Sequence, residues 1–522
     1  MLVKTPFNIP EIQTLIAQHL DKEDYPKYGL ISKAWHGVLR PEHWESVVFD
    51  AKGPFFHDWQ AEHLVDHIRT LEYHAGAFQG SMPTDGYNRL TTLRIIHVHN
   101  RARREPEIWP PLVQLVQRMA GGPLVAVELV STNAIPEFWE ALSHYHLKSL
   151  SLENSMSPSP RDTTAMACFW KICRSVETLN LRFSNGYACP LIRSRLFQLK
   201  HLDLEHSNIK SSNPDWSQAR PWLCSPNLES LRFVHSKTSA SGSELKAMAA
   251  DIRAAMVAAA KGLNHYEQDK DHADEGLEQY RGLIPGKKLH SIEVRPGSGG
   301  ASNEDLCLLI SNCDVLRKWC VPHSSLGALG FDSLLRHCDT LVELDLRTEM
   351  AMSPVVLALM CHCPHLEALS VDEMDISIFL RNLTWACTGL KRLRMSFDGH
   401  ILEERGLVAE ESPQIFQKLS NLPKLEYLDV LPRSGSVSRQ WGARPLFAIE
   451  HGLHYLENLK GLREIHGDLT LFTSASARWL VESWPKLEQV GFYVPGASVS
   501  ELPAAVKDIL HAQGVSMTSR MW

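Results

Sequence analysis

Four residues that could bind a metal lie close together in the run CHCPH: Cys361, His362, Cys363 and His365. Thiolate and imidazole groups are common ligands of Zn²⁺, so this run is the most metal-like stretch of the chain. A structural zinc site needs a second set of ligands at a matching spacing, and the sequence supplies none. Cys363 also fits a buried position of a repeat that runs along the chain, so we expect no metal here and no cofactor.

Two further stretches have a spacing that chemistry could use. Gly297, Gly299 and Gly300 stand between an expected strand and an expected helix, as in a phosphate-binding loop, but no Lys-Ser/Thr pair follows them. His63 and His67 lie four residues apart on an expected helix, without the HExxH pattern of metalloproteases. The sequence has neither a nucleophile motif nor a dinucleotide-binding motif. We therefore expect that the chain is not an enzyme.

The composition narrows the class of protein further. Of the 522 residues 44% are hydrophobic, which is ample for a sizeable core, and the net charge of −7 offers no basic surface for nucleic acid. No apolar run approaches the roughly 18–20 residues that span a bilayer. The start, MLVKTPFNIPEI, has a proline and polar residues where a signal peptide needs an apolar run. We expect a soluble protein of the cytoplasm, the nucleus or both, with its eleven cysteines as thiols.

The elements that must position any functional residue follow from a repeat. The template apolar-x-x-apolar-x-apolar recurs about fifteen times, mostly roughly 22 to 29 residues apart, from Ile68-Leu71-Tyr73 to Leu487-Val490-Phe492. Each copy predicts a short strand that stacks on the next one. The segments between them, such as SNEDLCLLISNC, SPVVLALMCHC and SASARWLVESW, have apolar residues at helical spacing. Ser302 or Asn303 is the expected cap of the first of these helices.

The residue three positions before the first apolar residue of a strand is also repeated. Cysteine, leucine or tryptophan fills this position, which indicates a buried site where a thiol acts as a small hydrophobe. Its members are Cys173, Cys313, Cys338, Cys363, Cys387, Leu196, Leu422, Leu459 and Trp484. The pattern resembles the cysteine-containing class of leucine-rich repeats, which is frequent in F-box proteins. The resemblance implies an α/β solenoid, a horseshoe with a parallel sheet on the concave face and helices on the convex face.

The N-terminal segment predicts a small group of helices. Residues 8–20, NIPEIQTLIAQHL, have Asn8 as a cap, a proline in the first turn and Glu11 at the capping-box position. The runs IPEI, LIAQHLDKED, LISKAWHGVL and PEHW then follow in an order and spacing that resemble the three-helix F-box. Ile9, Tyr25 and Pro26 depart from the usual F-box pattern.

The F-box resemblance implies docking on a Skp-family adaptor and, through it, on a cullin of a ubiquitin ligase. The residues that match the contact positions of the motif are Pro10, Ile12, Leu15, Ile16, Leu20, Leu30, Ile31 and Trp35. We assign Trp44 to the junction with the repeats. The order of F-box and repeats then implies a substrate-recognition subunit of a Skp–cullin–F-box ligase. The alternative is a repeat scaffold with no ligase role, whose N-terminal helices only cap the solenoid.

The domain limits follow from these patterns. We predict an F-box at 1–50, the repeats at 51–500 and a C-terminal cap or tail at 501–522. An insertion at 238–286 interrupts the repeats with an Ala-rich helical stretch and the acidic run NHYEQDKDHADEGLEQY. We interpret this insertion as solvated, and an acidic arm that selects a basic partner is the alternative.

A target protein is expected to bind the concave strands. The residues that flank the second apolar position, and the one after the third, face outward because side chains alternate along a strand. The candidates are His201, Asp203, Glu205, Glu343, Asp345, Arg347, Arg392, Arg394, Tyr427 and Asp429. Their mixed charge favours a protein surface of mixed charge, and neither nucleic acid nor a membrane is an expected partner.

Overall fold

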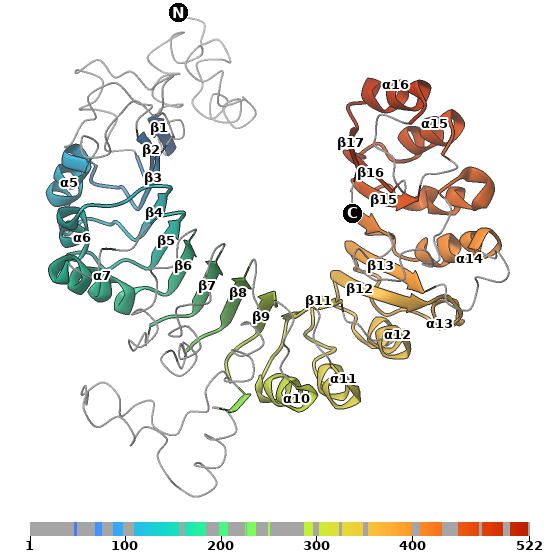
Figure 1. The fold of residues 1–522 in the computed structure, drawn as a ribbon, viewed down its shortest axis with the longest axis horizontal. Helices are drawn as coiled ribbons and strands as arrows, with labels where there is room; N and C mark the ends of the chain where they lie inside the picture. Colours follow the sequence, from blue (N-terminus) through green and yellow to red (C-terminus); the bar gives the residue numbers. More distant parts are fainter. Residues whose placement is uncertain are drawn as a thin grey trace, which may run out of the picture. The chain divides into compact units, whose positions relative to one another are not determined.

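The computed structural model describes a large part of the chain in two compact units, Met1–Leu228 and Glu229–Trp522 (Figure 1). The described residues are 46–49, 68–75, 87–97, 109–155, 158, 162–183, 198–206, 225, 227–235, 249–250, 287–295, 302–322, 326–347, 353–398, 408–430, 447–468, 472–493 and 502–519. The predicted F-box contacts, the residues Leu196, His63 and His67, the glycine run and nearly all of the insertion lie outside them.

The first unit is a parallel sheet with helices on one side. Its strands are β1 (Ser46–Phe49), β2 (Thr70–Ala75), β3 (Thr92–His97), β4 (Ala126–Val130), β5 (Ser149–Glu153), β6 (Thr178–Phe183) and β7 (His201–His206). Each pairs with the next in sequence order. The helices are α5 (Trp109–Arg118), α6 (Pro136–Leu142) and α7 (Thr163–Ser175). Consecutive strands are therefore consecutive repeats.

The second unit has the same organisation. Its strands are β8 (Ser230–His235), β9 (Ser291–Arg295), β10 (Lys318–Cys320), β11 (Glu343–Leu346), β12 (Ala368–Asp375), β13 (Arg392–Asp398), β14 (Tyr427–Asp429), β15 (Glu464–Asp468), β16 (Gln489–Tyr493) and β17 (Ser516–Ser519). They too pair in parallel and in sequence order. Its helical segments are α10 (Asn303–Asn312), α11 (Ala328–Leu335), α12 (Ser353–His362), α13 (Ile376–Phe379), α14 (Val408–Leu419), η9 (Ile449–His451), η10 (Leu453–Asn458), α15 (Ser474–Ser483) and α16 (Ala504–Ala512).

The template residues form the core, as the sequence predicts. In β5, Leu150 and Leu152 are buried, whereas Ser149, Ser151 and Glu153 on the other side are half-buried. The helices close the apolar side of the sheet with aromatic rings in contact. Trp109 lies tilted against Phe138 and Trp139 meets Phe169 edge to face, each pair with centroids 5.0 Å apart. The predicted α/β leucine-rich-repeat solenoid is confirmed in both units. In the described part, no helix has the length and apolarity that a bilayer span requires.

The predicted helix cap and the cysteine position are also confirmed. Ser302 Oγ accepts a hydrogen bond from the Asp305 backbone N–H at 3.2 Å, and the Asp305 carboxylate accepts one from the Ser302 N–H. All five cysteines of the repeated position are buried, as are Leu422, Leu459 and Trp484. Cys363 lies within this stack, where its thiol donates to Cys338 Sγ at 2.7 Å, and burial raises the pKa of Cys313 to about 12. Of the CHCPH run, His362 and His365 are exposed. Among the described residues, no group of His, Cys, Asp or Glu could hold a metal ion.

The repeats extend past both predicted limits. β1 pairs with β2 through Val47 opposite Leu71, so the sheet includes residues of the segment predicted as F-box. Counting back along this register, Trp44 has the sequence position that Ile68 has in the next repeat, although Trp44 lies outside the described residues. At the other end, α16 and β17 form a further helix and strand within 501–522. The template misses β17 because Gly514 and Ser519 replace two of its apolar residues.

The weakest copy of the template, Leu462-x-x-Ile465, has a glycine in place of its third apolar residue, because a neighbouring ring fills the space that a side chain would need. Gly467 holds the third inward position of β15, and the buried Phe447 ring occupies the space beside it. A Cβ on Gly467 would lie 2.3 Å from Phe447 Cε2. Phe447 in turn packs on Phe416 with ring centroids 5.2 Å apart, so the ring belongs to the core. An aromatic side chain from another segment therefore replaces the missing apolar residue.

We predict that Gly467→Ala lowers the free energy of unfolding by about 1–3 kcal/mol, because a close-packed core cannot accommodate the added methyl group. Gly461→Ala is the matched control in the same repeat, since a Cβ there would lie 3.6 Å from Leu425 O, an ordinary contact. Urea unfolding monitored by circular dichroism measures both variants. Equal midpoints for the two variants would contradict the steric explanation.

Candidate protein-interaction face

The open face of each sheet is the side away from the helices. In the second unit it brings together all seven of the predicted target-binding residues that lie there. One row across the strands is Glu343, Ala368, Arg392 and Tyr427, and the next is Asp345, Ser370, Arg394 and Asp429. Arg347 follows directly after β11. We call these nine residues the charged face.

Small side chains separate the two charged sides of this face. Ala368 and Ser370 on β12 lie between the carboxylates of β11 and the guanidinium groups of β13. β11 and β13 are separated by about 9–10 Å, because they are two strands apart in the sheet. The short side chains of β12 leave a shallow depression between the charged side chains of these two strands. Arg392 reaches across this depression, with Nη2 3.6 Å from Glu343 Oε1. Opposite charges therefore face each other over a shallow surface.

On the β11 side, charges are held by close pairs. Arg347 donates to Asp345 from Nε at 2.8 Å and from Nη2 at 2.6 Å, which is the forked geometry that suits a carboxylate. These hydrogen bonds raise the pKa of Arg347 above its ordinary value. Glu343 also forms an ion pair with Lys318, whose Nζ lies 3.2 Å from Glu343 Oε2. The carboxylates on this side are consequently fixed in place before any partner binds.

Lys318 continues the charges toward β8. Its Nζ lies 3.0 Å from Glu293 Oε2, and Arg232 Nε lies 3.3 Å from Glu293 Oε1. Burial raises the pKa of Glu293, but the hydrogen bond and charge of Lys318, together with Arg232, outweigh it and leave the pKa below its ordinary value. The result is a ladder of alternating sign: Arg232, Glu293, Lys318, Glu343 and Arg392.

On the β14 side, Asp429 is only 1% exposed, and its carboxylate contacts the neighbouring side chains of the charged face. Its Oδ2 accepts a hydrogen bond from the Tyr427 hydroxyl at 3.1 Å and lies 3.6 Å from Arg394 Nε. The Tyr427 ring packs beside His466, with centroids 5.4 Å apart. Gly491 leaves room for that imidazole, since a Cβ there would lie 1.8 Å from His466 Nδ1. Asp429 is thus placed to orient Arg394 and Tyr427, and direct contact with a partner falls to those two side chains.

The two arginines of β13 are the most available charges of the face. The Arg392 side chain is 61% exposed and that of Arg394 is 34% exposed. Each makes an ion pair at 3.6 Å, and neither guanidinium donates a hydrogen bond to any residue in the described part of the chain. A guanidinium group has five N–H donors, and arginine is enriched among residues that dominate binding energy. These donors can serve carboxylates or carbonyls of a bound protein.

The remaining predicted residues, His201, Asp203 and Glu205, lie on β7 in the first unit. Arg182 of β6 pairs with Asp203 at 3.1 Å and with Glu205 at 3.7 Å. The structure therefore does not gather all ten candidates in one unit. It does show that Asp203 and Glu205 share one cation, Arg182, which also pairs with Glu153 at 3.7 Å.

Sequence reasoning omitted Arg232, Glu293 and Lys318, which extend the charged face toward β8. The signal for them was present, because each flanks the second apolar residue of its repeat in the same way as the named candidates. Glu464, 3.6 Å from His466 Nε2, follows the same rule on β15. What the sequence could not show is which of these charges neutralise one another.

Comparison with known proteins adds two distant likenesses. No family model matches this sequence, and no curated protein does. Among solved structures, a TLR13–ssRNA13 complex has a TM-score of 0.36 at 13% identity, covering 85% of this chain and 54% of that one, so this chain spans about half its length. A yeast complex of Rad7 and Elc1 has a TM-score of 0.34 at 11% identity, covering 98% and 93% of the two chains. Likenesses this distant carry no conclusion about function.

We predict that Glu293→Gln lowers the free energy of unfolding at pH 7 by about 1–3 kcal/mol, since Lys318 and Arg232 lose their shared carboxylate. Because the folded-state pKa of Glu293 lies below its ordinary value of 4.5, its stabilising effect is complete above pH 4.5. The effect disappears as the pH falls through the folded-state pKa. The difference between variant and wild type should therefore shrink toward acid pH in urea titrations.

Glu426→Gln is the control for this experiment, because Glu426 is exposed and removal of its charge leaves no buried cation behind. It should change stability little at any pH. A Glu293→Gln penalty that stays constant between pH 7 and pH 3 would contradict the charge ladder.

Proposed function

We propose that this chain is a substrate-recognition subunit of a Skp–cullin–F-box ubiquitin ligase, acting in the cytoplasm, the nucleus or both. Residues 1–50 would dock on the Skp-family adaptor through the F-box contacts named from the sequence. The charged face would hold the target protein. The chain itself would transfer no group, so its role would be to bring a target to the ligase.

The observation that carries the recognition half of this proposal is the exposed arginine pair of the charged face. Arg392 and Arg394 stand at the centre of a surface whose other charges are largely neutralised by neighbours. Leucine-rich-repeat solenoids present extended binding surfaces of this kind. The ligase half rests on the resemblance of residues 8–44 to the F-box, in which the motif precedes the repeats.

The geometry favours a target of mixed charge. A target carboxylate would accept hydrogen bonds from Arg392 and Arg394, while Tyr427 offers an aromatic surface next to them. A target lysine or arginine would form an ion pair with Glu343. The present ion pairs of Glu343 with Lys318 and Arg392 are partly exposed, so a target cation can replace one of them. Complementary charges of this kind favour specificity and rapid association over raw affinity.

The cap without a ligase role remains the second candidate, because one observation favours it. The first described strand starts at Ser46, inside the segment predicted as F-box, and Trp44 has the sequence position of a core residue of the first repeat. A segment joined so closely to the sheet could shield its N-terminal edge. The two candidate functions differ in what would be lost if the N-terminal helices were removed: adaptor binding for the docking module, and cooperative unfolding for the cap.

For the docking half we predict that Leu15→Ala/Ile31→Ala/Trp35→Ala reduces capture of a purified Skp-family adaptor at least about tenfold, because large apolar contacts dominate such interfaces. The thermal midpoint of the variant should stay near that of the wild type. A chain lacking residues 1–43 should behave in the same way, and it retains Trp44 and β1, which a cut at residue 50 would remove. Normal adaptor capture by the triple variant would exclude docking, and cooperative unfolding lost by the shortened chain would favour the cap.

For the recognition half we predict that Arg392→Glu/Arg394→Glu removes target proteins from affinity capture after proteasome inhibition, since reversed charges repel the target's carboxylates. Mass spectrometry should still detect the adaptor and the cullin with this variant. Lys424→Glu/Lys486→Glu, which reverses two exposed charges in turns of the same unit, is the matched control and should keep its targets. An unchanged target list with the arginine variant would remove the charged face from the proposal.

A further inference from the structure

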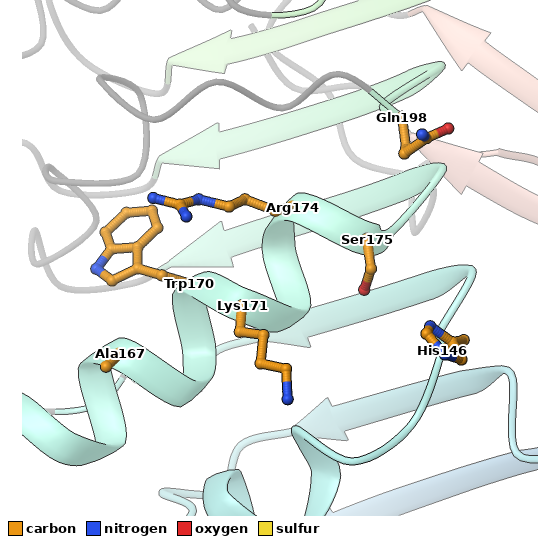
Figure 2. A pocket seen from close by; sticks show the side chains of 7 residues that line it. All are labelled: His146, Ala167, Trp170, Lys171, Arg174, Ser175 and Gln198. Atoms are coloured by element: carbon orange, nitrogen blue, oxygen red, sulfur yellow. The ribbon is translucent and has the colours of Figure 1, made fainter. Parts of the chain in front are cut away.

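A groove of about 780 Å³ lies along α7 in the first unit, on the helical side and not on the open face (Figure 2). Its lining combines the Trp170 indole with the cations Lys171 and Arg174, all from α7, and with the imidazole of His146 from the segment before β5. No carboxylate lines it among the residues that the structure describes. The groove therefore has an excess of positive charge, whereas positive and negative side chains alternate on the open faces of the sheets.

The fold of α7 sets these side chains along one stripe. Asp162 caps the helix by accepting a hydrogen bond from the Ala165 N–H at 2.9 Å. From that start, Trp170 and Arg174 are four residues apart and Lys171 and Arg174 are three apart, so they are neighbours on the helix surface. Figure 2 shows the Arg174 side chain extending toward Trp170, with His146 near the C-terminal end of the helix. The stripe of Trp170, Lys171 and Arg174 is therefore a continuous surface about one turn long.

Trp170 is fixed from the inside and accessible from the outside. Its ring packs on Phe169 with centroids 5.9 Å apart, and Phe169 continues the buried row through Trp139 at 5.0 Å. Phe169 is fully buried, whereas Trp170 is half-buried. A rigid, partly exposed indole of this kind can serve as an anchoring surface for an apolar side chain.

The described residues around the groove leave its two cations without a neutralising partner. Lys171 and Arg174 are exposed, and neither makes an ion pair or a side-chain hydrogen bond within the described part of the chain. Nearby on the same unit, Lys200 by contrast is paired with Glu177 at 2.8 Å. Charge complementarity therefore calls for an anionic occupant. The half-buried Trp170 ring beside these cations offers a contact for an apolar side chain, so an acidic protein segment that also carries apolar residues is the fitting class.

We propose that the α7 groove binds an acidic segment of a partner protein. Carboxylates of that segment meet Lys171 and Arg174, and an apolar side chain of the same segment lies on the Trp170 ring. This site is separate from the charged face and does not depend on the proposed ligase role. It gives the helical side of the first unit a binding function of its own.

The test uses the full chain and a fluorescein-labelled peptide of alternating Glu-Glu-Leu units, with fluorescence anisotropy as the readout. We expect Lys171→Glu/Arg174→Glu to weaken binding at least about tenfold, because two attractive charges become repulsive. Trp170→Ala should weaken it by about three- to tenfold through lost apolar contact. Both variants should keep the circular dichroism spectrum of the wild type, since the three side chains are wholly or partly exposed.

Three comparisons identify the site and the occupant. Lys424→Glu/Lys486→Glu controls for net charge, and Arg392→Glu/Arg394→Glu controls for capture by the charged face. The net-charge control should bind the peptide within about twofold of the wild type, and the arginine variant should keep the part of the binding that Lys171→Glu/Arg174→Glu removes. A single-stranded oligonucleotide should bind more weakly than the peptide. The proposal is overturned if the wild type does not bind the peptide, if the α7 variants bind it normally, if the arginine variant loses it, or if the oligonucleotide binds as well.

Discussion

The constraint on which this structure depends is the in-register parallel pairing of its strands. In each unit, equivalent residues of successive repeats lie opposite one another, about 4.8 Å apart in the hydrogen-bonding direction. Inward positions therefore form continuous apolar rows, such as Leu129, Leu152 and Leu181. Any residue that breaks a row must be compensated by its surroundings. Gly467 illustrates this, because Phe447 fills the place that its missing side chain leaves.

The same constraint governs the charges of the open face. Like charges in one row would stand next to each other, so the sign alternates along it, as in Glu72, Arg94 and Glu128 of the first unit. In the second unit, Lys318 and Glu343 are opposite charges in one row and Arg232 and Glu293 in another, until β12 supplies Ala368 and Ser370. Beyond these neutral residues, β13 carries two arginines whose nearest carboxylates are at 3.6 Å. The most available charges thus occur where the alternation is interrupted.

Much of this could be predicted from the sequence, because inward and outward positions depend on a period of two and a recurring template. The strands, the buried cysteines and the Ser302 cap follow from local pattern. The burial of Asp429 and His466, on the face predicted to be open, does not. Their surroundings come from other repeats, which no local pattern encodes. The F-box contacts stay predictions, since they lie outside the described residues.

The helical side obeys a different spacing, and this explains why unbalanced charge can persist there. Packed helices lie about 8–10 Å apart, roughly twice the distance between strands. A cation on the outer side of α7 therefore has no equivalent residue close enough to demand an opposite charge. Lys171 and Arg174 can stay unpaired without a cost in stability, whereas Arg94 on β3 is held between two glutamates. Folding therefore places no requirement on Lys171, Arg174 and the half-buried Trp170 indole along this stripe, and the proposed binding of an acidic segment would supply one.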